Sequence, residues 1–171
     1  MPVHDSLHGT LIQFESQIMK SLFFSLLLSL STLSAVQAQS VDIKEPWARA
    51  TVAGQKATGA FMQLTAPANM KLVGVNSPVA GVTEIHEMKM DGNTMKMSSI
   101  ASLALPAGKM VELRPGSYHV MLMDLKEPLK ADSKLAMTLT FENDKGQKSD
   151  VQLSVPVRAM NAQAPRQEHK H

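Results

Sequence analysis

The sequence predicts an all-β protein, a single Greek-key β-sandwich or barrel over residues 39–160, and three observations support this prediction. Apolar and polar residues alternate with period two in the clearest segments, residues 137–141 and 151–157. Short apolar segments of this kind recur between turn-forming residues. No segment has an i, i+3, i+4, i+7 apolar pattern long enough to require a helix, so many short strands are favoured.

Candidate strands follow one another at short spacing in this region. The first three read VDIKEPWARA, TGAFMQLTA and KLVGV, with Ala53-Gly54 as the turn signal between the first two. TEIHEMKM and TMKMSSI flank Asp91-Gly92 and predict a hairpin. KMVELR and YHVMLMDL lie on either side of Pro115-Gly116, and the last two strands flank Asp144-Lys145-Gly146.

Residues 19–38 have the features of a secretory signal peptide. Lys20 supplies a basic start, residues 21–33 form an apolar stretch too short to span a membrane, and Val36-Gln37-Ala38 is a small-residue cleavage site. We expect cleavage after Ala38 and a periplasmic location. Residues 1–18 contain acidic side chains that do not suit a signal peptide, so we interpret them as an over-extended reading of the gene. No cysteine is present to carry a lipoprotein anchor, and no membrane anchor is expected.

Composition excludes several classes of function. The 171 residues include no Cys, which excludes disulfides, thiolate zinc sites, iron–sulfur clusters, blue-copper centres and cysteine nucleophiles. The formal charge of +2 comes from 17 basic and 15 acidic residues without a basic block, so no nucleic-acid partner is expected. The unusual number is 13 Met, a residue that ordinarily fills gaps in cores.

A methionine-rich hairpin is predicted at residues 86–97, where one histidine and four methionines surround the Asp-Gly turn signal. If this Asp-Gly pair forms the centre of a type I′ turn, Met88 faces Met95 and His86 faces Met97. A turn shifted by one residue instead places Met97 opposite Met88. Either register gathers the sulfur atoms and His86 on one face of the hairpin.

A second segment carries the same residue types on alternate positions. His119, Met121 and Met123 point to one face of their strand, and Val120 and Leu122 point to the other. If the two aliphatic residues face the core, the histidine and methionine face is left for a site or an edge.

Two imidazoles and several thioethers are therefore available on adjacent β elements. Thioethers are soft, neutral ligands that select Cu(I) over Zn(II), Mg(II) or Ca(II), and imidazole tolerates several metals. The pattern predicts a Cu(I) site. The alternative is that these methionines are core filler and the histidines structural, because both residue types more often have those roles.

The spacing of His86, Met97, His119 and Met121 resembles the H-x10-M-x21-H-x-M signature of the periplasmic copper chaperones called PCu(A)C. The segments that also resemble this family are Trp47-Ala48-Arg49-Ala50, Thr58-Gly59-Ala60-Phe61, Leu72-Val73-Gly74-Val75, Leu105-Pro106-Ala107-Gly108 and Pro115-Gly116. The resemblance implies a cupredoxin-like β-sandwich that binds one Cu(I) through those four residues. It also implies delivery of the metal to an acceptor, typically the binuclear copper site of cytochrome c oxidase.

Further residues extend this hypothesis. Met88 and Met123 are candidates for an auxiliary thioether shell, the alternative being that they fill or decorate the hairpin. Residues 161–171 read as a disordered tail in which His169 and His171 could bind Cu(II) through imidazole, the alternative being a solvated tail without a role.

Three functions remain open at this point: copper delivery, copper sequestration or resistance with the same site, and a metal-free interaction domain. No enzymatic activity is expected, because both histidines between residues 39 and 160 belong to the methionine spacing rather than to a nucleophile and a carboxylate. For copper delivery, the expected partner is a copper-accepting protein such as a cytochrome c oxidase subunit or another copper-assembly factor. We expect the chaperone itself to be a monomer.

Overall fold

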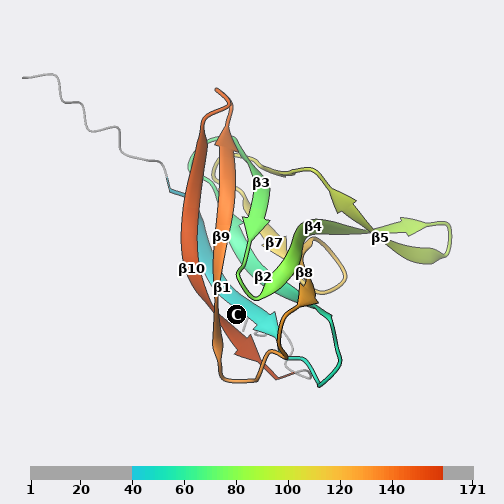
Figure 1. Cartoon of the computed structure of the whole chain (residues 1–171). Coiled ribbons are helices and arrows are strands. Elements are labelled where there is room, and N and C mark those ends of the chain that lie inside the picture. Colours follow the sequence, from blue (N-terminus) through green and yellow to red (C-terminus); the bar gives the residue numbers. More distant parts are fainter. Residues whose placement is uncertain (1–39, 160–171) are drawn as a thin grey trace, which may run out of the picture. The chain divides into compact units, whose positions relative to one another are not determined.

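The computed structural model describes residues 40–159 (Figure 1). The predicted signal peptide at 19–38, the preceding residues 1–18 and the tail with His169 and His171 lie outside the described residues. The predictions made for those segments therefore stay predictions. Within residues 40–159 there is no helix with the length and apolarity that a membrane crossing requires.

The described region is built from strands, which confirms the all-β prediction. Ten strands are present between residues 40 and 159: β1 (Asp42–Arg49), β2 (Ala57–Thr65), β3 (Met70–Asn76), β4 (Ala80–Asp91), β5 (Thr94–Ile100), β6 (Leu103–Leu105), β7 (Met110–Leu113), β8 (His119–Leu125), β9 (Lys134–Asn143) and β10 (Lys148–Arg158). Nine of them overlap the segments predicted from apolar alternation. Strand β6 was not predicted because three residues are too few to show a period.

The strands form one hydrogen-bonded path that folds into two halves. The order is β5-β4-β8-β2-β1-β10-β9-β3-β6, and β7 pairs with β2. One half contains β5, β4, β8, β2, β7 and β1, and the other contains β10, β9, β3 and β6. The chain passes between the halves several times, for example from β2 to β3 and from β8 to β9, as in Greek-key folds. Parallel pairing of β1 with β10 joins the halves through Ala48↔Val157 and Arg49↔Arg158.

The core lies between the two halves. Val120 and Leu122 of β8 are fully buried in it, as are Leu139 and Phe141 of β9 from the opposite half. This placement confirms that the aliphatic side of the His119–Leu125 strand faces the core. Since side chains alternate along a strand, His119, Met121 and Met123 are directed to the outer face of the sheet.

The β4–β5 hairpin extends beyond the sandwich (Figure 1). Its register pairs Met88 with Met97, Met90 with Met95, and Asp91 with Thr94. The first of the two registers considered, with Met88 opposite Met95 and His86 opposite Met97, is therefore wrong, and the shifted register is correct.

The turn explains this outcome. Gly92 has a φ of 62°, whereas Asn93 does not have a positive φ. A positive φ at the first central residue alone is the type II′ pattern, which glycine adopts without strain. A type I′ turn centred on Asp91 and Gly92 would need a positive φ at Asp91 as well, and the chain avoids this by placing glycine first.

Candidate metal centre

The predicted site residues come together on the outer face of three neighbouring strands. His86 of β4 pairs directly with His119 of β8, and Glu84 pairs with Met121. The two imidazole rings have centroids 5.7 Å apart and an interplanar angle of 56°. Both histidine residues are buried to the same degree, each with 7% of its surface exposed. The two imidazoles are thus held side by side by backbone pairing.

His119 is oriented by one backbone contact and presents its other nitrogen to a sulfur atom. Its Nδ1 lies 3.0 Å from the carbonyl oxygen of Ser117. Since a carbonyl oxygen only accepts, Nδ1 carries the proton in this hydrogen bond and Nε2 of the neutral ring keeps its lone pair. That Nε2 lies 3.3 Å from Sδ of Met97. A nitrogen lone pair and a thioether sulfur therefore meet at one point, as two ligands of one soft metal would.

His86 shows the same arrangement with the roles of its nitrogens exchanged. Its Nε2 lies 2.7 Å from a carboxylate oxygen of Glu84. An ionised carboxylate accepts the Nε2 proton, so the lone pair of the neutral ring is on Nδ1. Nδ1 is buried and has no hydrogen-bond partner among the described residues. A buried nitrogen without a partner is costly unless something else satisfies it, and a metal ion would do so.

The methionine side chains reach the same pocket from three strands, β4, β5 and β8. A pocket beside the histidines is lined by Met88, Met97, Met121 and His119, together with Arg49, Gly59, Phe61, Pro115 and Gly116. Met97 comes from the edge strand β5 and is 51% exposed, so its side chain extends over β4 to reach His119. The structure thus brings together the four residues of the spacing motif and adds Met88.

Met123 lies farther along β8 than the other predicted ligands. It pairs with Ala57 and Val82, is half-buried, and does not line this pocket. It shares the face of Met121 but is separated from His119 by three residues of the strand. The two auxiliary candidates therefore differ, with Met88 at the pocket and Met123 away from it.

Two aromatic side chains lie next to the His119 ring. Trp47 and Phe61 stack at 4.5 Å, and Phe61 lies 6.3 Å from the His119 ring, centroid to centroid. Gly59 makes this possible, since a Cβ at that position would lie 2.8 Å from Cζ of Phe61. The ring therefore occupies the space above the glycine, next to the imidazole.

Two arginines border the aromatic pair. The Arg49 guanidinium lies 5.8 Å from the centre of the Phe61 ring, and that of Arg158 lies 5.5 Å from the centre of Trp47. These are cation–π distances. Nε of Arg49 is the second buried polar side-chain atom that has no hydrogen-bond partner among residues 40–159. Positive charge thus lies at one rim of the pocket.

The face of the hairpin opposite the histidines carries a separate ionic group. Lys89 pairs with Glu87 at 2.7 Å. The pKa of Glu87 is lowered, mainly by the hydrogen bond from Lys89. Desolvation has the second largest effect and raises this pKa, and the hydrogen bond from the Tyr118 hydroxyl has a smaller effect and lowers it. The same hydrogen bonds raise the pKa of Lys89 and of Tyr118. Glu87 is therefore ionised at neutral pH and engaged away from the two histidines.

The donor set favours a soft metal. Among residues 40–159, no three His, Asp or Glu side chains lie close enough together to hold a metal ion. A tight site in this region therefore needs the thioethers, which Zn(II), Mg(II) and Ca(II) do not favour and Cu(I) does.

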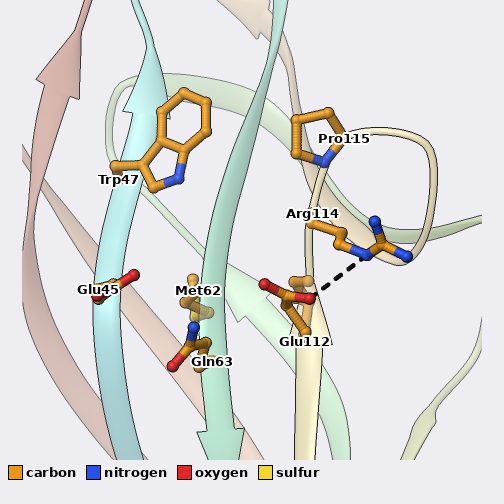
Figure 2. A pocket seen from close by; sticks show the side chains of 8 residues that line it. Glu45, Trp47, Met62, Gln63, Glu112, Arg114 and Pro115 are labelled. Atoms are coloured by element: carbon orange, nitrogen blue, oxygen red, sulfur yellow. Dashed lines mark ion pairs between the residues drawn. The ribbon is translucent and has the colours of Figure 1, made fainter. Parts of the chain in front are cut away.

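A neighbouring hollow differs in its chemistry. It is lined by residues of β1, β2 and β7 and by the two residues after β7, and Figure 2 shows its labelled side chains, including Trp47, Pro115 and the ion pair of Arg114 with Glu112. Its other polar groups are Glu45 and Gln63. Both would offer oxygen atoms as ligands, and the methionine that lines this hollow, Met62, is buried. The methionine and histidine pocket is therefore the better candidate for a copper site.

Two features of the site were not predicted from the sequence. Glu84 stands two residues before His86, and that spacing places both on one strand face, so alternation could have identified it. The hydrogen bond from His119 to the Ser117 carbonyl has no signature in the residue types, because every residue carries a carbonyl group.

Comparisons with known proteins identify the family of the chain. Residues 41–157 match the family described as "Putative lipoprotein LpqE-like". A relative named "Putative lipoprotein Lxx21020" from Leifsonia xyli is 32% identical over 123 residues, which cover 71% of this chain and 72% of that protein. The uncharacterised protein RP573 of Rickettsia prowazekii is 32% identical over 111 residues and is covered over 61% of its length.

Solved structures extend the comparison. The apo PCuAC domain of PmoF2 is 25% identical with a TM-score of 0.57, and the match covers 72% of this chain and 93% of that domain. The copper-bound form of the same domain matches with a TM-score of 0.55 at 25% identity, over 70% of this chain and 92% of that domain. The Cu(I) form of DR1885 from Deinococcus radiodurans is 26% identical with a TM-score of 0.55, over 78% of this chain and 88% of that protein. The cupredoxin-like fold expected from the spacing motif is thereby confirmed.

Proposed function

The chain belongs to the LpqE-like family and is of the PCu(A)C type, and from this premise we propose that it is an exported copper chaperone. In this proposal it binds one Cu(I) through His86, Met97, His119 and Met121. It then passes the metal to a copper-accepting protein, with a copper site of cytochrome c oxidase as the expected destination. Its role is to bind and transfer the ion, without catalysis.

One observation carries the proposal: each histidine has one nitrogen held by a protein acceptor and the other left for a metal. Nδ1 of His86 is buried without a partner, and Nε2 of His119 faces the sulfur of Met97. Two neutral nitrogens and two thioethers add no negative charge to a monovalent cation, and they match the softness of Cu(I).

The mixed exposure of the ligands supports transfer. The histidines are buried, whereas Met97 is half exposed on an edge strand. A partner can therefore displace the Met97 thioether first and the imidazoles afterwards. The Cu(I) ion exchanges one ligand at a time and keeps its oxidation state throughout.

Met88 fits an auxiliary role because it lines the pocket with three of the four proposed ligands. Met123 has weaker support, since it lies outside that pocket. Substituting Met88→Leu and Met123→Leu separately will distinguish them. We expect slower Cu(I) transfer for the first variant and no change for the second. Transfer at the wild-type rate in both variants would contradict the proposed auxiliary role.

The test of the ligand set is a competition titration with a colorimetric Cu(I) chelator under anaerobic conditions. We expect one tightly held Cu(I) in the wild type and a loss of at least about tenfold in affinity for Met97→Leu and for His119→Ala. Met110→Leu is the matched control, because Met110 is also exposed on a strand, at 53%, but lies outside the pocket. Unchanged affinity in both ligand variants would contradict the proposed site.

Delivery and sequestration use the same site and differ in the next step. Mixing the loaded protein with a soluble, copper-free oxidase domain separates them. Delivery predicts that the metal moves to the acceptor faster than it is released to buffer. Retention of Cu(I) by the loaded protein would instead favour sequestration, the alternative function.

The tail carries a separate proposal, that His169 and His171 bind Cu(II) loosely through imidazole. Electron spin resonance of Cu(II) added to the protein with and without residues 162–171 tests it. We expect the nitrogen-rich signal to disappear with the tail, and an unaltered signal would exclude it as the site. Residue Gln39 at the N-terminus of the secreted protein, determined by intact mass, would support export through cleavage after Ala38.

A further inference from the structure

The outer half of the β4–β5 hairpin carries a methionine pair that the proposed copper site does not use. Met90 and Met95 stand directly opposite each other across the two strands. They are 62% and 45% exposed, respectively. Directly paired side chains have Cβ atoms roughly 4.5–5.5 Å apart, so both sulfurs can reach one ion between them.

The pattern of the hairpin argues against a packing role for this pair. Met90 and Met95 share their face with Met88 and Met97, so every paired position on that face between residues 88 and 97 is a methionine. An exposed methionine side chain removes little apolar surface from water, so it adds little to stability. β-Branched residues also have a higher strand propensity than methionine. The thioether itself is the property that these four positions share.

The opposite face of the hairpin is chemically distinct. Lys89 pairs with Glu87 there, and Lys96 pairs with Asp91. These ion pairs neutralise the local charges, and the methionine face between residues 88 and 97 has no charged side chain among its paired positions. A metal on that face would therefore meet only sulfur ligands, which favours Cu(I) over harder cations.

The two methionine pairs form a ladder that leads to the histidines. Residues two apart on a strand are separated by roughly 6.6 Å, so the Met90 and Met95 pair lies one such step from the pair of Met88 and Met97. Met97 in turn contacts Nε2 of His119 at 3.3 Å. The ladder thus runs without interruption from the exposed turn to the buried imidazoles.

We propose that Met90 and Met95 form an outer Cu(I) site, through which the ion enters and leaves the inner site. This inference rests on the proposed copper function and adds a second, weaker site to it. The ion binds first to the two outer sulfurs. Bonds from Cu(I) to Met88 and Met97 then form as those to Met90 and Met95 break, and bonds to Met121 and the two imidazoles complete the inner site as the bond to Met88 breaks. Copper stays Cu(I) throughout, and no electron or proton transfer is needed.

The direct test is a titration of protein labelled with ¹³C in the methionine methyl groups, followed by NMR with anaerobic Cu(I). We expect the first equivalent to shift the signals of Met97 and Met121, and the second to shift those of Met90 and Met95. The Met110 methyl group serves as the internal control, since it is exposed to a similar degree on β7. Met90 and Met95 signals that move no more than that of Met110 over both equivalents would overturn the outer site.

A variant separates this inference from the proposed function. Met90→Leu with Met95→Leu keeps the size and apolar character of both side chains while removing both sulfurs. We expect unchanged affinity for the first Cu(I), loss of the second, and loading of the inner site that is slowed about tenfold. Loading and second-equivalent binding equal to those of wild type would refute the outer site but leave the inner site intact. Absence of first-equivalent shifts at Met97 and Met121 would instead contradict the proposed function.

Discussion

Removal of the Glu84 carboxylate should weaken copper binding, although Glu84 is not itself a proposed ligand. Its carboxylate accepts the Nε2 proton of His86 at 2.7 Å and thereby leaves the lone pair on the buried Nδ1. In Glu84→Ala the ring loses this partner and can exchange its proton between the two nitrogens. A larger fraction of the molecules with a neutral His86 ring then carries the proton on Nδ1, and a protonated nitrogen cannot bind a metal.

The structure sets the size of this effect. Loss of a residue that orients a metal-binding histidine typically costs 10–100-fold in metal affinity. The Glu84 side chain is 38% exposed, so water can replace part of the hydrogen bond. We therefore expect the lower end of that range, about tenfold or ~1.4 kcal/mol of binding free energy. Glu84→Gln should lose less, because its amide oxygen can still accept the proton.

Two assays check this prediction. Competition with a Cu(I) chelator measures the affinity, and ¹⁵N NMR of the histidine rings reports the tautomer of His86 in the metal-free protein. Glu112→Ala is the control, since Glu112 pairs with Arg114 on the surface and lies outside the copper pocket. An affinity for Glu84→Ala within twofold of wild type, with an unchanged His86 tautomer, would refute the reasoning.

Three further predictions concern the scaffold. Leu122→Ala should lower the free energy of unfolding by about 2–5 kcal/mol, measured by urea denaturation, because this side chain is fully buried; a loss below about 1 kcal/mol would contradict it. Gly59→Ala should lower Cu(I) affinity severalfold by displacing Phe61 from the site, and wild-type affinity in a chelator titration would count against that support. Tyr118→Phe should destabilise the protein at neutral pH by removing the hydrogen bond to Glu87. The pKa of Glu87 is lowered, so its contribution to the free energy of unfolding is present above the ordinary value of 4.5 and is lost as the pH falls through the folded-state pKa. The pKa of Tyr118 is raised, so its contribution is present below the ordinary value of 10.0 and is lost as the pH rises through the folded-state pKa. The difference in urea midpoint between Tyr118→Phe and wild type should therefore persist from pH 6 to 8 and shrink in acid, and a pH-independent difference would be inconsistent with this pairing.

Much of the fold was accessible from the sequence because most of the strands bury one side, although β5 does not. The alternation of Val120 and Leu122 with His119 and Met121 separates the two faces of β8, and the structure shows that the aliphatic face meets the core. Strand β6 could not be found this way, since three residues show no period. Pairing of β1 with β10 was also inaccessible, because it joins segments separated by most of the domain and depends on how the two halves close.

The residues of the candidate site could be proposed from the sequence, but their arrangement could not. Long spacings identified four residues that the structure brings together, whereas the hairpin register depended on the φ of a single glycine. Moving the turn by one residue changes the partner of Met97 from His86 to Met88. Orientation of the histidines was beyond the sequence because it rests partly on a backbone carbonyl, that of Ser117.

The central claim is that nitrogen and sulfur from the two histidines and two methionines hold one Cu(I). X-ray absorption at the copper edge of the one-to-one complex tests this claim most directly, because it identifies both the oxidation state and the ligand atoms. We predict Cu(I) with both imidazole nitrogen and thioether sulfur in its shell, and weaker sulfur scattering in Met97→Leu with Met121→Leu. A shell of nitrogen and oxygen alone in the wild type, or of sulfur alone, would contradict the proposed site.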